Sequence, residues 1–279
     1  MTAAAATLDV ARLAALAQAR RAEFAAATPF PHVVIDDFLQ ADAAAALLGE
    51  FDVPEEGWTF LHHFNEHKRI FTAAERMGPV SRAVFAELQS PAVLAALQTL
   101  TGVAGLLGDP DLDGGGLHET PPGGFLNVHA DFQSHTRQRH WRRELNLILF
   151  LSPDWREEYG GHLELWDADV RHCVQRILPR ANRAVLFRVG PHAFHGVPGG
   201  VHCPPGQTRK SLAVYYFSAD PTPRPLAPTH YVPLPDDPPA RRALIRVDGW
   251  MVYAYSLLKR YAGLNDARTG KLLRRLFGR

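Results

Sequence analysis

The chain has 279 residues and a formal net charge of +1; 46% of its residues are hydrophobic and 21% are charged. This length and composition can bury a sizeable core in one domain with appendages or in two small domains, and the near-zero charge demands neither nucleic acid nor a membrane as partner. The two cysteines, Cys173 and Cys203, form no C-x-x-C pair and argue against a disulfide framework and a cysteine-based zinc site.

The N-terminal stretch is rich in alanine and is interrupted by Asp9 and Arg12. It lacks a basic segment followed by an uninterrupted apolar run, so it predicts a helix and not a signal peptide. No stretch of the chain reaches the roughly 20 apolar residues that a transmembrane helix needs. We therefore expect a cytoplasmic protein without a transmembrane segment.

Four regions with different patterns follow one another along the chain. Residues 1–104 predict mostly helical support, with a first core strand at 31–39, PHVVIDDFL. Residues 105–222 predict the core. Dense prolines in residues 223–240 predict a linker, and residues 241–279 predict a basic helical extension. The N-terminal helices are expected to cover the outer face of the main sheet.

Short strands punctuated by glycine and proline dominate the predicted core. They are expected at residues 125–129, 144–151, 162–166, 184–187, 191–197 and 208–217. This pattern predicts an α+β protein with a double-stranded β-helix, or jelly roll, whose open mouth is a natural place for a site.

One possible metal-binding pattern begins at the end of the first of these strands, with His129-Ala-Asp131. Residues i and i+2 of an extended segment point the same way, so the two side chains can sit side by side. Two histidines and one carboxylate can occupy one face of an octahedral Fe(II). About one His-x-Asp triple is expected by chance among fourteen histidines, so the motif alone is weak. His195 and His192 are rival third ligands.

Five ordered segments between residues 125 and 219 raise the specificity of this pattern: HAD, LNLILFLSPDW, GGHLELW, FHGV and RKSLAVYYF. Together they resemble the catalytic core of the Fe(II)/2-oxoglutarate-dependent dioxygenases, in the prolyl 4-hydroxylase-like branch. The resemblance implies iron held by His129, Asp131 and His195, with FHGV favouring His195 over His192. It also implies 2-oxoglutarate and O2 as cosubstrates, with ascorbate as an additional reductant. The implied reaction hydroxylates an unactivated C–H bond and releases succinate and CO2.

Arg209 is the predicted anchor for the far carboxylate of 2-oxoglutarate. A buried carboxylate needs a counter-charge, and a guanidinium can offer two parallel hydrogen bonds. Strand alternation puts Arg209 and Ser211 on one face and Lys210 on the other, which makes Lys210 the less favoured anchor.

Three more residues are predicted to line the cosubstrate pocket: Asn146, Phe150 and Leu163. Asn146 and Phe150 share a strand face, and Leu163 is expected to form a wall. In proteins of the resembled branch a tyrosine often stands at the position of Phe150, where its hydroxyl contacts the cosubstrate. That hydroxyl is absent here, so either Asn146 or Ser211 is expected to replace it.

A basic cluster lies between the His-x-Asp motif and the next strand: Arg137, Arg139, Arg142 and Arg143. It is expected to overhang the mouth of the site. Two interpretations stay open: recognition of an anionic substrate, or a mobile lid whose charges remain solvated. The substrate is expected to be a small molecule or a peptide.

The C-terminal region 241–279 carries ten Lys and Arg residues against Asp248 and Asp266. A solvated face of a packing helix is favoured over docking to nucleic acid or to an anionic membrane surface. Helical spacing is indicated by four hydrophobic residues: Trp250, Tyr253, Leu257 and Leu258. The two aromatic residues among them are expected to be core anchors.

Two other classes of function compete with the dioxygenase. A cupin-like metal enzyme would use the same three ligands without 2-oxoglutarate, and would not need Arg209. A non-catalytic jelly roll that acts as a binding module would not need iron at all. The three ligands together with the Arg-x-Ser pattern favour the dioxygenase over both.

Overall fold

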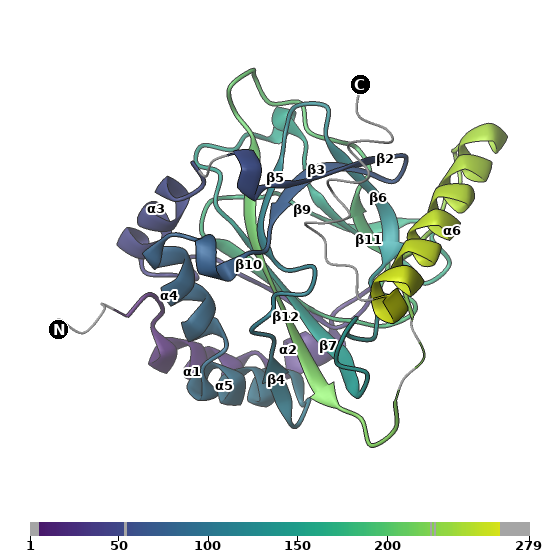
Figure 1. Cartoon of the computed structure of the whole chain (residues 1–279). Coiled ribbons are helices and arrows are strands. Elements are labelled where there is room, and N and C mark those ends of the chain that lie inside the picture. The colour runs from purple at the N-terminus through teal and green to yellow at the C-terminus, as the bar shows by residue number, and fades with distance from the viewer. Residues whose placement is uncertain (1–5, 53–54, 224, 226, 263–279) are drawn as a thin grey trace.

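The computed structural model describes residues 6–52, 55–223, 225 and 227–262, and its core is one extended antiparallel sheet that curls on itself (Figure 1). One half of the sheet runs in the order β1 (His32–Ile35), β10 (Arg183–Arg188), β7 (Trp141–Phe150), β12 (Arg209–Ala219), β5 (Gly116–Thr120) and β3 (Glu66–Phe71). The other half runs β6 (Phe125–Ala130), β11 (His195–Val197), β8 (Leu163–Trp166) and β9 (Cys173–Ile177). The predicted α+β architecture with a jelly-roll-like core is confirmed.

Strand β3 joins the two halves, because its C-terminal part pairs with β5 and its N-terminal part pairs with β6, while β2 pairs along its other edge. Three short strands extend the sheet: β2 (Thr59–His63) pairs with β3, β4 (Leu106–Gly108) with β12, and β13 (His230–Tyr231) with β6. Residues 223–240, predicted as a linker, thus contribute a strand that lies against β6.

Five helices cover one face of the larger half of the sheet. They are α1 (Val10–Ala19), α2 (Arg21–Ala26), α3 (Ala41–Gly49), α4 (Pro79–Leu88) and α5 (Pro91–Thr101). Alternate residues of the strands, such as Leu145, Leu147 and Val214, share one buried cluster with residues of these helices. The expectation that the N-terminal helices cover the outer face of the main sheet is therefore confirmed.

The opposite face of the same strands looks into the curl. Phe150, Val185 and Phe187 pack there against Leu163 and Leu165 of β8. Each such side chain contributes about 1.5–3 kcal/mol when it is fully removed from water. This second cluster keeps the two halves of the sheet together and surrounds the interior with apolar side chains.

The hairpin of β2 and β3 corrects the expectation that residues 1–104 hold one core strand among helices. Alternation cannot reveal these strands, because β2 is half-buried or exposed throughout and β3 places charged residues on both faces. Two of the histidines in this stretch, His62 and His67, pair across the hairpin with ring centroids 4.2 Å apart.

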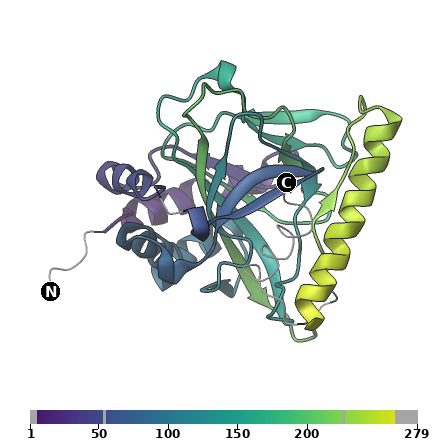
Figure 2. The same ribbon diagram turned by 45° about the horizontal axis from the view of Figure 1, so that its top comes forward.

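The C-terminal helix α6 (Pro239–Ala262) lies outside the sheet, beside β6 and β13 (Figures 1 and 2). Its inward face buries Ile245 and Asp248. The side-chain amide of Asn65 donates to the Ile245 carbonyl at 3.2 Å and to Asp248 Oδ2 at 2.6 Å. His63 Nδ1 lies 2.7 Å from the same carboxylate oxygen.

The predicted anchors of α6 are therefore partly wrong. Trp250, expected in the core, is 72% exposed, because it lies two residues beyond Asp248 and so on the other side of the helix. Tyr253 and Leu257 are half-buried, and the side chain of Leu258 lies outside the described residues.

Within the part of the chain that the structure describes, no single helix is long and apolar enough to cross a membrane. Taken together, α4 and α5 have the length and composition for a span, but they are bent by 49° and bury Val84, Leu88 and Leu97 in the core.

The contact between α6 and the β2–β3 hairpin is expected to depend on pH. Burial lowers the pKa of His63, but hydrogen bonds to Asp248 and Glu66 outweigh it and raise this pKa to about 9. Because the usual pKa is 6.5, the charged imidazole stabilises the fold fully below pH 6.5, and the contribution is lost as pH rises through about 9. Asp248→Asn should lower the free energy of unfolding by about 2 kcal/mol at pH 6.5 and by much less at pH 10.

Chemical denaturation at both pH values measures this difference. Arg246→Gln, on the exposed side of the same helix, is the matched control and should change neither value. A loss of stability in Asp248→Asn that is the same at both pH values would contradict the ion pair.

Candidate metal and cosubstrate site

Two neighbouring strands bring the predicted metal ligands together. His129 on β6 and His195 on β11 are directly paired in the sheet, and Asp131 follows the end of β6. His129 Nε2 is 3.5 Å from Asp131 Oδ1, and His195 Nε2 is 3.5 Å from Asp131 Oδ2. One ligand atom from each residue lies within 4.8 Å of the other two, as a shared metal ion requires.

The two imidazoles are oriented to bind a metal through Nε2. His129 Nδ1 is 2.9 Å from the Asn127 carbonyl, and His195 Nδ1 is 3.0 Å from the Ala193 carbonyl. Each Nδ1–H donates to its carbonyl, which leaves the Nε2 lone pair facing Asp131. Burial lowers the pKa of His195 to about 4, so this imidazole is neutral at pH 7. The donor set and its orientation fit Fe(II).

Gly196 allows β11 to approach β6 closely enough for this arrangement. A Cβ atom at Gly196 would stand 2.9 Å from the Leu126 carbonyl oxygen and 3.0 Å from that of Asn127, so a side chain would force the strands apart. The rival ligand His192 is exposed and lies before β11, and it is not part of the cluster.

Asp131 is the carboxylate of the cluster, and two further side chains hold it. The amide of Asn146 donates to Asp131 Oδ2 at 3.0 Å, and Arg143 Nη2 lies 3.2 Å from the same oxygen. Burial raises the pKa of Asp131, but the charge of Arg143 and the interactions with the two imidazoles outweigh it and hold the pKa well below its usual value. Asp131 is therefore ionised, as a metal ligand must be.

Arg143 corrects the prediction that the four arginines overhang the mouth. Its side chain is fully buried, with the guanidinium 3.3 Å from the ring centroid of Tyr215 and 4.3 Å from that of Phe132. The pairing of β7 with β12 skips Glu144, so one extra residue bulges from β7 at this point. Plain alternation would put Arg143 on the helix-covered face with Leu145, and the bulge turns it inward.

The other three arginines stay at the surface or close to it. Arg137 is exposed and pairs with Asp111 at 2.9 Å, and Arg139 is exposed on the same loop. Arg142 is half-buried and bonds to the carboxylate of Glu144. The basic cluster is thus split between a solvated loop and the interior.

Arg209 stands at the start of β12 with its side chain inside the curl. Its Nε donates to the Gly161 carbonyl at 2.7 Å, and its guanidinium lies 4.8 Å from the ring centroid of Phe150. Burial lowers the pKa of Arg209 to about 10, so it remains charged at pH 7. Among the described residues no carboxylate lies within ion-pair distance of it. Gly161, with φ +68°, permits this contact, because a Cβ there would stand 3.0 Å from Arg209 Cδ.

The structure separates the other predicted cosubstrate residues into two groups. Ser211 and Phe150 are paired across β12 and β7 near Arg209, and Leu163 packs against Phe150. Asn146 lies four residues before Phe150, and its amide is bonded to Asp131. Asn146 therefore supports the metal ligand and does not lie with Arg209, which leaves Ser211 as the hydroxyl near that end.

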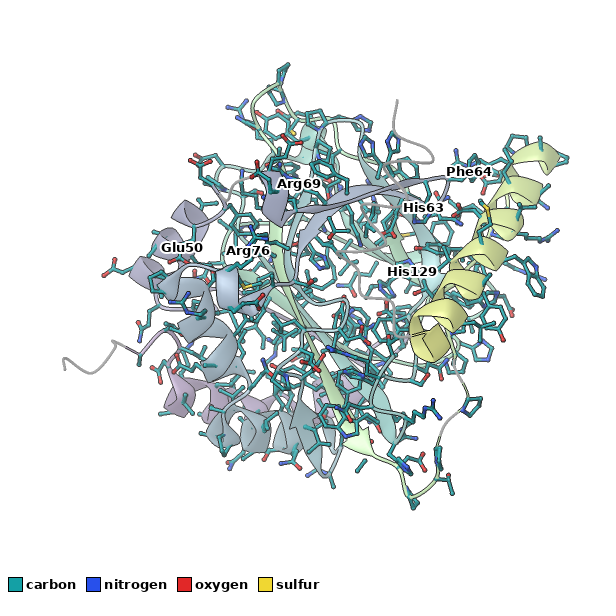
Figure 3. All side chains as sticks on the ribbon, viewed as in Figure 1. Glu50, His63, Phe64, Arg69, Arg76 and His129 are labelled. Atoms are coloured by element: carbon teal, nitrogen blue, oxygen red, sulfur yellow. The ribbon has the colours of Figure 1, made fainter. Side chains whose placement is uncertain are left out.

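Three residues that were not predicted from the sequence lie beside the metal ligands: Glu66, Lys68 and Tyr231. The Tyr231 ring lies between His129 and His63, at centroid distances of 5.4 and 6.3 Å, and Figure 3 shows those two histidines on the side facing α6. Lys68 Nζ is 3.0 Å from Glu66 Oε2, and its charge interacts with that of Asp131. The E-x-K spacing of β3 is a usable signal, but only once β3 is known to be a strand.

A second cluster of possible metal ligands consists of Asp109, Asp111 and His135. His135 Nδ1 accepts hydrogen bonds from the backbone N–H groups of Arg137 and Gln138, each at 3.0 Å. Its proton must then be on Nε2, which faces Asp109 at 3.4 Å and has no lone pair to offer. Asp109 also accepts from the N–H groups of Asp111 and Asp113, so the cluster serves to hold the loop.

The region that holds this site also resembles a known protein family in sequence. Residues 115–217, which include the three candidate ligands and Arg209, match the model of the 2OG-Fe(II) oxygenase superfamily. Mouse prolyl 3-hydroxylase OGFOD1 is 37% identical over 59 residues, covering 20% of this chain and 11% of the mouse protein. This chain therefore spans only about a tenth of the length of that relative.

Solved structures show the same fold at low identity. A Pseudomonas putida prolyl-4-hydroxylase has a TM-score of 0.52 and 20% identity, covering 74% of this chain and 98% of that one. A Trichoplax adhaerens prolyl hydroxylase, in complex with a hypoxia inducible factor peptide fragment, has a TM-score of 0.52 and 15% identity over 75% and 90% of the two chains. Fe(II) and 2-oxoglutarate are typical of the superfamily. Residues 115–217 of this chain therefore match the 2OG-Fe(II) oxygenase superfamily, and the chain shares its fold with prolyl hydroxylases.

Proposed function

We propose that this enzyme uses Fe(II), 2-oxoglutarate and O2 to hydroxylate an unactivated C–H bond of a peptidyl substrate. The observation that carries the proposal is the buried charge of Arg209. A guanidinium without a counter-charge is costly in an apolar interior, and the described chain supplies no carboxylate for it. An anion from outside the chain would complete this site.

The far carboxylate of 2-oxoglutarate has the chemistry for this role. It can accept two hydrogen bonds from the guanidinium, as carboxylates commonly do, and one from the Ser211 hydroxyl. The other end of the same molecule carries the keto and carboxylate oxygens that chelate iron. Arg209 would then fix the orientation of the cosubstrate, because it holds one end while the metal holds the other.

The other residues of the site would bind the metal, orient its carboxylate ligand or keep the interior apolar. His129, Asp131 and His195 would hold Fe(II), and Asn146 and Arg143 keep the Asp131 carboxylate ionised and oriented. Bound iron supplies the activation of O2 that is coupled to decarboxylation of 2-oxoglutarate. Phe150, Phe187 and Leu165 keep the interior apolar, which excludes water from the reacting groups.

A peptide is the substrate class that we favour. The fold is shared with a prolyl-4-hydroxylase and with a prolyl hydroxylase that was solved with a peptide fragment. The polar groups beside the metal ligands, Lys68 with Glu66 and the Tyr231 ring, can donate to or accept from backbone amides.

The cosubstrate site is tested by anaerobic titration of the Fe(II)-loaded enzyme with 2-oxoglutarate. The visible charge-transfer absorption of the chelate should saturate in the wild type and disappear in His195→Ala. Arg209→Ala should raise the dissociation constant of 2-oxoglutarate about thirtyfold, since hydrogen bonds to a charged group are lost. Lys210→Ala is the matched control, because its side chain bonds to Thr208 on the opposite face of β12.

Three results would overturn this assignment. Equal affinities in Arg209→Ala and Lys210→Ala would remove Arg209 from the site. Tight iron binding without any absorption band would favour a cupin-like metal enzyme. A protein that binds no iron would be a binding module.

The separate roles of Asn146 and Ser211 give a second prediction. Asn146→Leu should weaken Fe(II) binding by about tenfold or more, because Asp131 loses an orienting hydrogen bond. Ser211→Ala should leave Fe(II) affinity unchanged and weaken 2-oxoglutarate binding. Isothermal titration with Fe(II), and then with 2-oxoglutarate, distinguishes the two variants, and the reverse pattern would return Asn146 to the cosubstrate end.

The substrate class is tested by mass spectrometry of peptides incubated with the enzyme, Fe(II), 2-oxoglutarate and O2. Proline-containing peptides should gain one oxygen atom and accelerate formation of succinate, whereas the same peptides with alanine in place of proline should do neither. Acceleration by free amino acids or sugars, and not by any peptide, would replace the proposed substrate class while leaving the cosubstrate chemistry intact.

A further inference from the structure

The outward face of α6 is apolar and exposed. Leu244 is 49% exposed, Val247 56%, Trp250 72% and Met251 59%. Ala243 and Ala254 are exposed on the same side. In a helix with 3.6 residues per turn these six positions form one continuous face about 17 Å long, from residue 243 to residue 254. We call it the α6 apolar face.

This face points away from the rest of the described chain. Ile245 and Asp248 define the opposite, buried side of the helix, where Asn65 and His63 bind it. Figures 1 and 2 both show α6 at the edge of the molecule, so that one side packs on the β6 region and the other faces outward. Large apolar side chains gathered on one exposed face indicate a surface that binds something.

The charges around the face indicate an anionic occupant. Asp248 is the one acidic residue in the sequence of α6, and it is turned inward and paired with His63. Arg246 is exposed beside the apolar face, whereas Arg241, near the start of the helix, faces β6 and bonds to Asp237 and Asn127. The outward surface of α6 therefore offers Arg246 and apolar side chains, and no carboxylate among its described residues.

Other occupants fit this surface less well. A second copy of the chain would bring two such helices together across a symmetric contact, with a cation on each and no outward carboxylate to pair it. Residues 263–279 lie outside the described residues, and their sequence, with five Lys or Arg against Asp266, would add positive charge to positive charge. Nucleic acid would match the charge of Arg246, but it would gain nothing from a row of aliphatic side chains.

We propose that the α6 apolar face docks on the surface of an anionic phospholipid bilayer. The helix would lie parallel to the surface, with Leu244, Val247, Trp250 and Met251 in the boundary between headgroups and acyl chains. Tryptophan favours that depth, and Arg246 would meet lipid phosphates. This surface contact does not require any helix to cross the bilayer.

Binding to vesicles tests the proposal with the full chain. The protein should sediment with vesicles of phosphatidylcholine and phosphatidylserine mixed three to one, and much less with phosphatidylcholine alone. The fluorescence emission of Trp250 should shift to shorter wavelength on binding, and Trp250→Phe should remove that shift. Raising the salt concentration should weaken binding, because part of the attraction is between exposed charges.

Val247→Glu is the decisive variant, because it puts a carboxylate in the middle of the apolar face. It should weaken binding to the anionic vesicles at least tenfold. Val174→Glu is the matched control, since Val174 is 45% exposed on β9, away from α6, and it should bind as the wild type does. Circular dichroism and the unfolding temperature of both variants establish that each is folded.

Four outcomes would overturn the proposal. These are no sedimentation with anionic vesicles, equal sedimentation with neutral vesicles, equal losses in Val247→Glu and Val174→Glu, and a Val247-dependent dimer in solution without vesicle binding. Binding of duplex DNA that Val247→Glu leaves unchanged, together with no binding to vesicles, would assign Arg246 to nucleic acid.

Discussion

The burial of one negative charge, on Asp131, determines how the centre of this molecule is built. A carboxylate taken out of water is stable only when cations and hydrogen-bond donors surround it. Arg143 and the amide of Asn146, both on β7, provide that surrounding together with the imidazoles of His129 on β6 and His195 on β11. The curl of the sheet is what brings these strands within reach of one carboxylate. The pairing of β6 with β11 and the pairing of β7 with β12 therefore serve the same small volume.

Two buried arginines lie at the two ends of the interior, and they differ in whether the chain supplies a counter-charge. Arg143 has its counter-charge, Asp131, in the chain and also lies against two aromatic rings. Arg209 has a backbone carbonyl and an aromatic ring but no described carboxylate. A small dicarboxylic acid that chelates iron would satisfy both ends. One of its carboxylates would pair with the positive charge of Arg209, and its other end would bind the metal. The direction that we propose for the cosubstrate is therefore argued from the charges of the site.

The sequence predicted the parts of the site that depend on regular spacing. His129 and Asp131 follow from i, i+2 geometry, and the inward face of Arg209 follows from alternation along β12. Arg143 could not be placed, because a single extra residue at Glu144 reverses the direction of its side chain. Trp250 was misplaced because helical spacing alone cannot say which face is buried. The buried face of α6 is determined by Asn65 and His63, which contact Ile245 and Asp248. Both residues lie about 180 residues earlier in the chain.

The inward carboxylate of α6, on Asp248, connects the α6 apolar face with the polar residues beside the metal ligands. Asp248 bonds to His63, His63 to Glu66, and Glu66 to Lys68, whose charge reaches Asp131. Charges in such a chain are mutually compensating, so moving one of them leaves its neighbour buried without a partner. A displacement of α6 would then be felt at Glu66 and Lys68, beside the metal ligands. The α6 apolar face and the polar residues beside the metal ligands are therefore parts of one connected structure. A partner that binds the α6 apolar face acts on a helix whose movement would disturb Glu66 and Lys68.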